Sequence, residues 1–326
     1  MSGVVVKTVA PAEDGMRLDR WFKAHYPALG HGALQKLLRT GQVRLDGARA
    51  KPGDRVSEGQ AVRVPPLPDA GPEPKRSDVS ERDARWLQSL VIHRDADVLA
   101  LNKPAGLAVQ GGSKTERHLD GMLDALVLDG RERPRLVHRL DRDTSGVLLL
   151  ARTRSAATAL AHSFKSRDAL KVYWALVRGV PKPRAGTINL PLKKIGHAGD
   201  QRVVGANAHD EEAQGAITDY IVLANAGRRA AFVALSPRTG RTHQLRAHMA
   251  AIGHPILGDR KYGGEDASLS DELDPLLHLH ARGITLAHPR KGRLRVLADL
   301  PQHMRRSLDY LGFDVPSDDP FQIFEE

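Results

Sequence analysis

The chain has 326 residues, a net charge of +10, 27% charged residues, 41% hydrophobic residues and no cysteine. The length predicts about two domains, and the composition is typical of a globular protein, not of a disordered one. Without cysteine, the chain has no disulfides, thiolate nucleophiles or thiolate metal sites, and we expect a cytoplasmic protein. The longest apolar runs are much shorter than the roughly 20 residues of a membrane span, and a signal-peptide pattern is missing, so no membrane partner is expected. The positive charge favours a polyanionic partner, although a basic surface that serves only solubility is an equally good interpretation.

Residues 1–15 form an N-terminal segment, and residues 16–64 form a small basic unit with ten Lys/Arg against four Asp/Glu. Apolar residues recur at helical spacing over 18–22 and 34–38. Asp46-Gly47 is a hairpin turn signal between short alternating segments. The pattern predicts two short helices and a small hairpin whose basic side chains lie outside an aliphatic core.

Residues 65–85 contain five prolines and charges of both signs. Proline fixes the backbone φ angle and removes a hydrogen-bond donor, so this stretch predicts a semi-stiff, extended linker.

Residues 86–312 form a larger block in which strand patterns dominate and helical patterns interrupt them. The expected helices cover 119–126, 155–167 with Ser155 as the cap, 242–252 and 301–311. The expected strands cover 90–93, 98–101, 135–140, 146–151, 172–177, 217–223, 231–235, 283–287 and 294–297. Regular βαβ alternation is missing, which predicts an α+β fold with a mixed, largely antiparallel sheet. The acidic tail, 313–326, is expected to be loosely held.

The segment His138–Gly146 carries two arginines and two aspartates where a turn between strands is expected. Arginines beside Asp141 favour an ionised carboxylate, which suits a nucleophile or base better than a general acid. A salt-bridged turn without catalytic function is the simpler alternative.

A second polar segment, Ser236–His248, predicts a helix start with Thr242 as its cap and Arg246 one turn later. An arginine that points inward needs a carboxylate or phosphate partner, because a buried unpaired charge is costly. Asp141 is the candidate partner, and a phosphate-binding surface helix is the alternative.

The third segment, Lys171–Gly179, alternates as a strand and places Lys171 and Tyr173 on one face. A tyrosine in such a position can stack on a base or donate a hydrogen bond, although core packing is its more common role.

Metal binding and nucleotide cofactors have little support in the sequence. The histidines 243, 248, 254, 278, 280 and 288 lack HExxH spacing. Neither a GxxxxGK[ST] motif nor a GxGxxG motif occurs, so the sequence predicts neither a metal site nor a nucleotide cofactor.

The segment His138–Gly146 resembles the signature of the RluA/RluC/RluD family of RNA pseudouridine synthases. Four further segments are similar to other blocks of that family in the same order: 101–106, 171–179, 240–248 and 254–259. Residues 16–64 resemble an S4 RNA-binding domain, with His31-Gly32 as a departure from its usual pattern. The segment Val109–Ser113 resembles the C-type members that act on the large ribosomal subunit.

The resemblance implies a catalytic domain over 86–312 that isomerises uridines of 23S ribosomal RNA to pseudouridine without a cofactor or metal. It implies that Asp141 is the catalytic carboxylate, that Tyr173 contacts the target base and that Arg246 pairs with Asp141. Base flipping and RNA contact are then expected of Arg139, Arg241 and His243. RNA binding by the S4 domain is expected of Arg17, Lys36, Arg39 and Arg44. The partner is large-subunit ribosomal RNA, and the protein is expected to be a monomer.

Three other functions remain open at this point. Transfer RNA is the alternative substrate within the family. A non-catalytic RNA-binding or ribosome-assembly module is a second alternative. A glycoside hydrolase that uses Asp141 and Asp143 is a third, but it needs one of the two carboxyls protonated, which Arg139 and Arg142 oppose.

Overall fold

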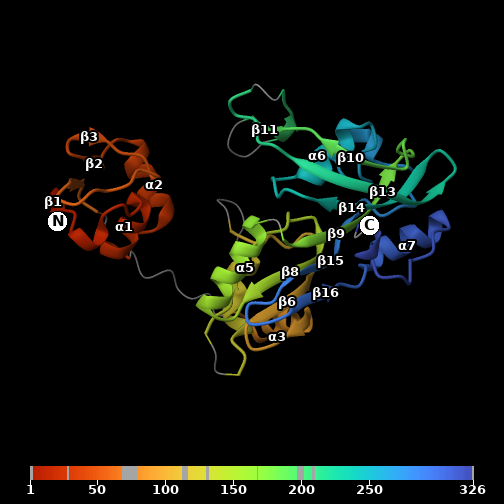
Figure 1. Ribbon diagram of the computed structural model, residues 1–326, viewed down its shortest axis with the longest axis horizontal. Coiled ribbons are helices and arrows are strands. Elements are labelled where there is room, and N and C mark those ends of the chain that lie inside the picture. The colour runs from red at the N-terminus through yellow and green to blue at the C-terminus, as the bar shows by residue number, and fades with distance from the viewer. Residues whose placement is uncertain are drawn as a thin grey trace. The chain divides into compact units, whose positions relative to one another are not determined.

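A computed structural model describes residues 3–27, 29–67, 79–111, 117–129, 132–166, 168–196, 202–207 and 210–324. The chain divides into two compact units, Met1–Asp78 and Val79–Glu326 (Figure 1). Each unit is described by itself. Within the described ranges, no helix has the length and apolar character needed to cross a membrane.

The first unit is a four-stranded antiparallel sheet with two helices. Its elements are β1 (Val5–Thr8), η1 (Pro11–Glu13), α1 (Leu18–His25), α2 (His31–Arg39), β2 (Arg44–Leu45), β3 (Ala48–Arg49) and β4 (Ala61–Val64). The strand order is β1-β4-β2-β3. Leu18, Trp21 and Phe22 of α1 are buried in its core, as the helical spacing predicted. Asp46 and Gly47 both have positive φ, which is the backbone of a two-residue hairpin turn.

Two features of this part of the chain differ from the prediction. Val5–Thr8 was placed in an N-terminal segment without secondary structure, but it pairs with β4 along its whole length. The linker predicted for 65–85 ends earlier, because α3 begins at Glu81 with the Ser80 hydroxyl accepting from the Asp83 N–H. Residues 68–78 of that predicted linker lie outside the described residues.

The second unit is built on a ten-stranded mixed sheet. Its strands are β5 (Val91–Arg94), β6 (Val98–Lys103), β7 (Arg135–Leu136), β8 (Ser145–Ala151), β9 (Leu170–Arg178), β10 (Ala185–Asn189), β13 (Ile217–Ala226), β14 (Ala230–Pro237), β15 (Leu279–Ala287) and β16 (Arg293–Leu297). The main order is β10-β13-β14-β9-β15-β8-β6-β5. β15 and β8 are parallel and the other neighbours are antiparallel. The prediction of an α+β fold with a largely antiparallel sheet is confirmed.

The remaining elements of this unit cover the sheet or extend from it. They are α3 (Glu81–Ser89), α4 (Leu119–Met122), η2 (Leu123–Leu126), α5 (Arg154–Ser166), β11 (Leu192–Ile195), β12 (Arg202–Gly205), α6 (Gln244–Ala251), η3 (Gly264–Ala267), α7 (Gln302–Leu311) and η4 (Gln322–Phe324). β11 and β12 form a separate two-stranded ribbon. α5 packs on β8 and β15, whereas α6 packs on β14, so the two helices flank the middle of the sheet (Figure 1).

The strand β9 lies between β14 and β15 and has a different environment on each face. Trp174 faces a core that includes Phe232 and Met304 of α7. Lys171 and Tyr173 lie on the opposite face. This alternation follows from the period of two residues in a strand, and it directs the two polar side chains toward the site described below.

The acidic tail is held more firmly than the sequence suggested. Phe321 is fully buried and packs with Phe313 in the core beneath α7. Arg295 of β16 forms an ion pair with Asp319 and lies over the Phe321 ring. Two aromatic anchors among acidic residues therefore tie the tail to the sheet.

Three predicted boundaries were wrong. The strand expected over 135–140 covers Arg135–Leu136, and the chain then leaves the sheet as a loop toward Asp141. The cap of α5 is Thr153, whose hydroxyl accepts from the Ala156 N–H, and not Ser155. α6 begins at Gln244, and the residue before it is His243 in a left-handed conformation (φ 53°), so Thr242 is not the cap.

Candidate active site

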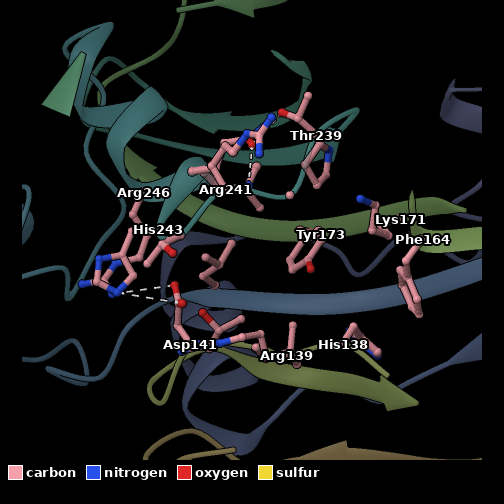
Figure 2. A pocket seen from close by; sticks show the side chains of 18 of the residues that line it. His138, Arg139, Asp141, Phe164, Lys171, Tyr173, Thr239, Arg241, His243 and Arg246 are labelled. Atoms are coloured by element: carbon pink, nitrogen blue, oxygen red, sulfur yellow. Dashed lines mark hydrogen bonds and ion pairs between the residues drawn. The ribbon is translucent and has the colours of Figure 1, made fainter. Parts of the chain in front are cut away.

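A cavity of about 570 Å³ opens over β9, between the C-terminal end of α5 and the start of α6 (Figure 2). The loop 138–144 forms one wall, and the segment 237–246 forms another. Lys171 and Tyr173 of β9 contribute a third side. The three polar segments singled out in the sequence therefore meet at one cavity, although they are separated by up to a hundred residues.

Asp141 sits in this wall, in a turn closed by a hydrogen bond from the Thr144 N–H to the Asp141 carbonyl (3.2 Å). Its side chain keeps 22% of its surface exposed, so a ligand in the cavity can reach it. Gly146, just after the turn, has φ +110°, and a Cβ there would lie 2.2 Å from the Ala281 carbonyl oxygen. Only glycine allows β8 to come this close to β15 at the point where the Asp141 loop ends.

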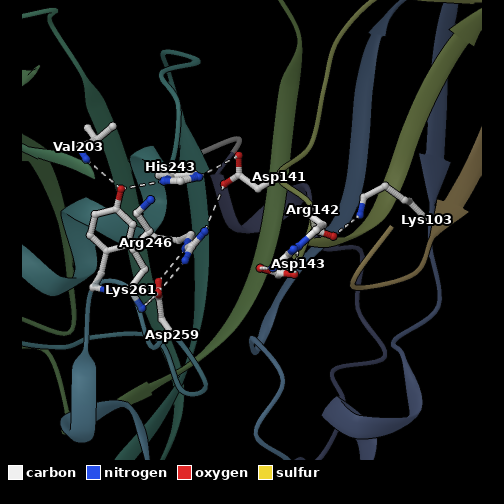
Figure 3. A network of polar contacts seen from close by, with 10 residues as sticks. Lys103, Asp141, Arg142, Asp143, Val203, His243, Arg246, Asp259 and Lys261 are labelled. Carbon is white, nitrogen blue, oxygen red and sulfur yellow. Dashed lines mark hydrogen bonds and ion pairs between the residues drawn. The ribbon is translucent and has the colours of Figure 1, made fainter. Parts of the chain in front are cut away.

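Lys103 holds this loop from behind. Its amino group is fully buried and donates to three carbonyl oxygens, of Pro104 (3.0 Å), Leu107 (2.9 Å) and Arg142 (2.9 Å) (Figure 3). Burial lowers the pKa of Lys103 to about 7, against the opposing charges of Asp143 and Asp141. The three bonds fix the backbone next to Asp141, so Lys103 is a positioning residue for the loop.

Arg246 projects from α6 into the wall beside Asp141, but its principal partner is Asp259. Its Nε and Nη2 donate to the two carboxylate oxygens of Asp259, both at 2.7 Å, and its Nη1 lies 4.0 Å from Asp141 Oδ2 (Figure 3). Asp259 is fully buried. Burial alone would lower the pKa of Arg246, but the bonds to Asp259 outweigh it and raise the pKa. Arg246 thus lies beside Asp141, the expected partner, but its hydrogen bonds go to a second carboxylate that was not predicted.

Asp259 is positioned by the tight segment that contains it. Gly258 has φ +76°, and a Cβ there would lie 1.9 Å from the Leu276 carbonyl oxygen. The Lys261 and Tyr262 N–H groups donate to Asp259 Oδ1 (3.1 and 3.2 Å). Backbone N–H groups thus hold the Asp259 carboxylate in place, and its two hydrogen bonds fix the orientation of the Arg246 guanidinium.

His243 is the second residue that faces Asp141. Its Nε2 lies 3.8 Å from Asp141 Oδ1, and its Nδ1 lies 2.8 Å from the Tyr262 hydroxyl. The Val203 N–H donates to that hydroxyl (3.1 Å), which leaves the tyrosine proton able to bond to Nδ1. Burial lowers the pKa of His243, with the charge of Asp141 opposing the shift. In the tautomer protonated at Nε2, the imidazole N–H faces Asp141.

Tyr173 lies between the Asp141 end and the α5 end of the cavity (Figure 2). Burial and the nearby charge of Asp141 raise its pKa above the ordinary value, so the phenol is neutral. Beyond it lie Lys171 and the stacked rings of His138 and Phe164, whose centroids are 4.5 Å apart. A planar ring that enters beside Asp141 would meet the Tyr173 side chain first.

The two other predicted RNA contacts, Arg139 and Arg241, line the same cavity and are exposed. Arg241 Nε donates to the Gly215 carbonyl (3.1 Å). Arg142, by contrast, pairs with Asp143 (3.0 Å between Nε and Oδ1) and not with Asp141. A second hollow of about 600 Å³, behind the first, shares Asp141, His243 and Arg246 with it and also contains this pair.

The basic residues predicted in the first unit lie on its surface. Lys36, Arg39 and Arg44 are exposed. Arg17 is bound to Asp19 through two hydrogen bonds (2.7 and 3.2 Å), so it is not an open cation. These four positions remain predictions as RNA contacts.

Two arginines missed as candidates extend this basic surface. Arg44 on β2 is the direct neighbour of Arg49 on β3 and of Arg63 on β4. Like charges at opposite strand positions are destabilising, and an anionic partner would relieve this cost. The row of arginines across three strands was not visible in the sequence because its register depends on the pairing.

One group of possible metal ligands occurs in the described part of the chain: Asp95, Asp97 and His288. Asp95 already accepts from His93 (2.8 Å) and His288 (3.2 Å), and Arg290 forms an ion pair with Asp97. These contacts use the lone pairs that a metal would need. His248, His278 and His280 are buried with protein partners on both ring nitrogens.

Three residues of the site were not predicted as site residues: Lys103, Asp259 and Tyr262. The first two stand in segments that were noted for their resemblance to family blocks, next to Pro104 and Gly258. A lysine before a proline, or an aspartate after a glycine, does not indicate that the charged side chain is buried. Tyr262 carries no such indication either, and its contact with His243 depends on the tertiary fold.

Comparison with known proteins agrees with this geometry. Residues 97–251 match the family model described as RNA pseudouridylate synthase. The chain is 34% identical to the ribosomal large subunit pseudouridine synthase C of Escherichia coli K12 over 316 residues, which are 94% of this chain and 97% of that protein. It is 32% identical to an uncharacterized RNA pseudouridine synthase of Synechocystis, over 96% of this chain and 94% of that one. The solved structure of human RNA pseudouridylate synthase domain containing 4 matches with a TM-score of 0.61 and 31% identity, over 72% of this chain and 97% of that one.

Proposed function

The chain belongs to the RNA pseudouridylate synthase family, and from this premise we propose that it converts uridines of 23S ribosomal RNA to pseudouridine, with Asp141 as the catalytic carboxylate. The observation that carries the proposal is the convergence of Asp141, Tyr173 and Arg246 on one cavity from three separate segments. The E. coli relative is named for the large ribosomal subunit, which favours ribosomal RNA over transfer RNA as the substrate.

The reaction needs an anionic group at the sugar and a space for the detached base. The glycosidic bond from ribose C1′ to uracil N1 breaks, and the ring turns and rejoins through C5. An ionised carboxylate can act as nucleophile or base in this process. Arg246 Nη1 lies 4.0 Å from Asp141 Oδ2 and His243 Nε2 lies 3.8 Å from Asp141 Oδ1, so both groups face the carboxylate that would carry out the reaction. The cavity volume of about 570 Å³ leaves room for a nucleotide.

The target uridine must leave its stack to reach Asp141, which costs a few kcal/mol and least in a loop or at a distorted base. Arg139 stands exposed at the same wall and is suited to take the place of the displaced base. The basic first unit, which we propose to be an S4 domain, would hold the surrounding RNA through phosphate contacts.

A glycoside hydrolase is disfavoured by the arrangement of carboxylates. Among the described lining residues of the first cavity, Asp141 is the one carboxylate. Asp143 reaches the second hollow, where Arg142 holds both of its oxygens (3.0 and 3.4 Å). Hydrolysis of a glycosidic bond needs a second carboxyl that can stay protonated.

A non-catalytic RNA-binding module is disfavoured by the number of residues that position Asp141 and the groups around it. Arg246, Asp259, Tyr262 and Lys103 all hold this loop or the groups that face it, and most of them are removed from solvent. Simple RNA binding needs exposed cations and not a supported carboxylate.

The target class is tested by mapping pseudouridine in the RNA of a host strain that carries or lacks this protein. We expect specific pseudouridines to disappear from 23S ribosomal RNA and to return when the wild-type chain is supplied. Loss confined to transfer RNA would contradict the proposed target, and an unchanged map of all RNA would contradict the proposed activity.

A further inference from the structure

Lys171 lines the reaction cavity and has no use in the function described so far. It lies on β9 two residues before Tyr173, on the same face, and opposite Ile284 of β15. The side chain is half-buried, and its amino group reaches the cavity (Figure 2). It makes no hydrogen bond or ion pair with any residue that the structure describes.

Lys103, in the same unit, is a buried lysine whose amino group has hydrogen-bond acceptors. Its amino group donates to three carbonyl oxygens at 2.9–3.0 Å. Among the described residues Lys171 has no such partners, and a cation withdrawn from water without them is costly. Burial accordingly lowers the pKa of Lys171 to about 8. A ligand that brings negative charge into the cavity would remove this cost.

The groups around Lys171 do not supply that charge. His138, in the loop that leads to Asp141, accepts the Leu149 N–H at Nε2 (2.8 Å), and burial lowers its pKa to about 3, so it is neutral. Tyr173, on the same strand, is neutral as well. α5 contributes the Phe164 ring and the exposed cation of Lys165, the exposed Arg139 stands at the other wall, and β15 places Ile284 beside Lys171. Asp141 is at the far end of the cavity (Figure 2).

The spacing of Lys171 and Tyr173 along β9 suits the length of a nucleobase. Residues two apart on a strand are about 7 Å apart, so Lys171 is one ring length beyond Tyr173 on the side away from Asp141. A uracil with its glycosidic end at Asp141 and its ring at Tyr173 directs a carbonyl oxygen toward Lys171. The phosphates lie on the opposite side of the ribose, away from this lysine.

We propose that Lys171 is a catalytic residue that binds a carbonyl oxygen of the target uracil and stabilises the negative charge that the ring carries when it is detached from the ribose. The inference rests on the proposed function and specifies how the same site handles the leaving base. A cation placed where charge develops, in a cavity partly shielded from water, is an effective form of transition-state stabilisation.

The charge balance of the reaction supplies the reason for a cation. When the C1′–N1 bond breaks, both electrons remain with the uracil, which becomes an anion with charge on N1, O2 and O4. The carboxylate of Asp141 balances the electron-poor C1′. The new bond from C5 to C1′ uses the electrons of the anion, the C5 hydrogen leaves as a proton, and N1 takes up a proton. No oxidant, reductant or other reactant is consumed.

A single lysine can hold the ring before and after it turns. Rotation about the axis through N3 and C6 exchanges N1 with C5 and, at the same time, O2 with O4. A cation that contacts O4 before rotation therefore contacts O2 after it, in the same place. The flexible lysine stem tolerates the motion, which a rigid donor would resist.

The first test compares Lys171→Met with Lys291→Met, a matched loss of an exposed lysine of the second unit that does not line the cavity. We expect Lys171→Met to lower kcat about 10²–10³-fold, the range for loss of one such donor, with RNA affinity within about twofold of wild type. Lys291→Met should keep kcat. A urea unfolding transition of the second unit at the wild-type midpoint establishes that the Lys171→Met protein is folded. Wild-type kcat in Lys171→Met would overturn the proposal.

The second test separates a base contact from a phosphate contact. Binding is measured to the same RNA with an abasic residue at the target position. Because the contact is to uracil, wild type and Lys171→Met should bind the abasic RNA equally. Weaker binding of the abasic RNA by Lys171→Met would assign Lys171 to the backbone and overturn the proposal.

The third test uses pH and the conservative variant Lys171→Arg. Lys171 is charged below a pH of about 8 in the free protein, so kcat/KM of wild type should fall as the pH rises above 8. Arginine does not titrate there, so the fall should move to higher pH in Lys171→Arg. An identical alkaline limb in both proteins would contradict the inference. If the wild-type protein makes no pseudouridine at all, the proposed function is wrong. If wild type is active and Lys171→Met is equally active, only the role of Lys171 is wrong.

Discussion

At the scale of single residues, the site contains one carboxylate that a ligand can contact, Asp141, and one that is buried, Asp259. Asp141 keeps 22% of its side chain exposed, whereas Asp259 is fully buried. Arg246 lies between them and is held by the buried partner, 4.0 Å from the exposed one. The guanidinium is thus fixed before substrate arrives, without neutralising Asp141 through a direct hydrogen bond. Such preorganisation avoids a cost at the moment of reaction.

Asp259→Ala should destabilise the second unit by about 3–5 kcal/mol, because it leaves Arg246 buried without its partner. Asp259→Asn keeps the shape and one acceptor oxygen and should cost less. Unfolding in urea measures both, with the exposed Asp271→Ala as the control. Equal midpoints for Asp259→Ala and Asp271→Ala would show that Arg246 does not depend on Asp259.

Asp141, Tyr173 and Arg246, three residues singled out in the sequence, line one cavity in the structure. Each stands in a segment with an unusual polar pattern. Asp259 was missed since a single carboxylate 13 residues beyond Arg246 looks like an ordinary loop residue. The left-handed backbone at His243 was not predicted either, because residues other than glycine adopt a positive φ only uncommonly.

At the scale of elements, β9 and β15 organise the site from the middle of the sheet. β9 directs Lys171 and Tyr173 into the cavity. β15 ties the neighbouring strands together, and its His280 contacts the Ser145 hydroxyl at the start of β8 (2.9 Å). His278, just before β15, contacts Ser307 of α7 (2.7 Å). Two buried imidazoles therefore link the centre of the sheet to its surroundings.

These two histidines predict an acid-sensitive fold. Burial lowers the pKa of His278 and of His280 to about 4, while an unfolded chain takes up these protons near pH 6.5. Between these values the unfolded state binds more protons, so the free energy of unfolding falls as the pH falls. We expect the Tm to drop by several degrees from pH 7 to pH 5. His280→Gln should be less stable at pH 7 and less dependent on pH, and a pH-independent wild-type Tm would contradict the argument.

Element boundaries were harder to predict than element types. The alternation in 172–177 and 231–235 placed two central strands correctly, although both extend further in the structure. The apolar run 135–140 was read as a strand, but it leaves the sheet after Leu136 to carry Asp141 to the cavity. A local sequence pattern indicates which face of a strand is buried. The end of the strand depends on where its partner strand ends, which the local pattern does not indicate.

At the scale of the whole molecule, the basic surface and the cavity lie in different units of the chain. The first unit carries exposed basic residues and no part of the cavity, whereas the second carries the whole of the cavity described above. The basic composition of 16–64 indicated this division from sequence. The strand Val5–Thr8 and the buried Phe321 were not foreseen, because short terminal segments gain their order from contacts with distant residues.

Lys36→Ala combined with Arg39→Ala should weaken RNA binding and reduce the salt dependence. Each lost phosphate contact lowers the slope of log affinity against log salt by about 0.7–0.9, so the pair should reduce it by up to about 2. kcat at saturating RNA should be unchanged. Lys291→Ala with Arg306→Ala, two exposed cations of the second unit, is the matched control. An unchanged slope in the Lys36/Arg39 variant would remove the first unit from the RNA interface.

If Asp141 acts in the chemistry and not in binding, its replacement by asparagine changes the rate of the reaction and leaves the affinity for RNA unchanged. Single-turnover pseudouridine formation and the Kd are measured for wild type and Asp141→Asn on the same ribosomal RNA fragment. We expect a rate loss of about 10³-fold or more, the order seen when a catalytic carboxylate becomes an amide, with the Kd within about twofold of wild type. Pseudouridine formation by Asp141→Asn at the wild-type rate would contradict this expectation.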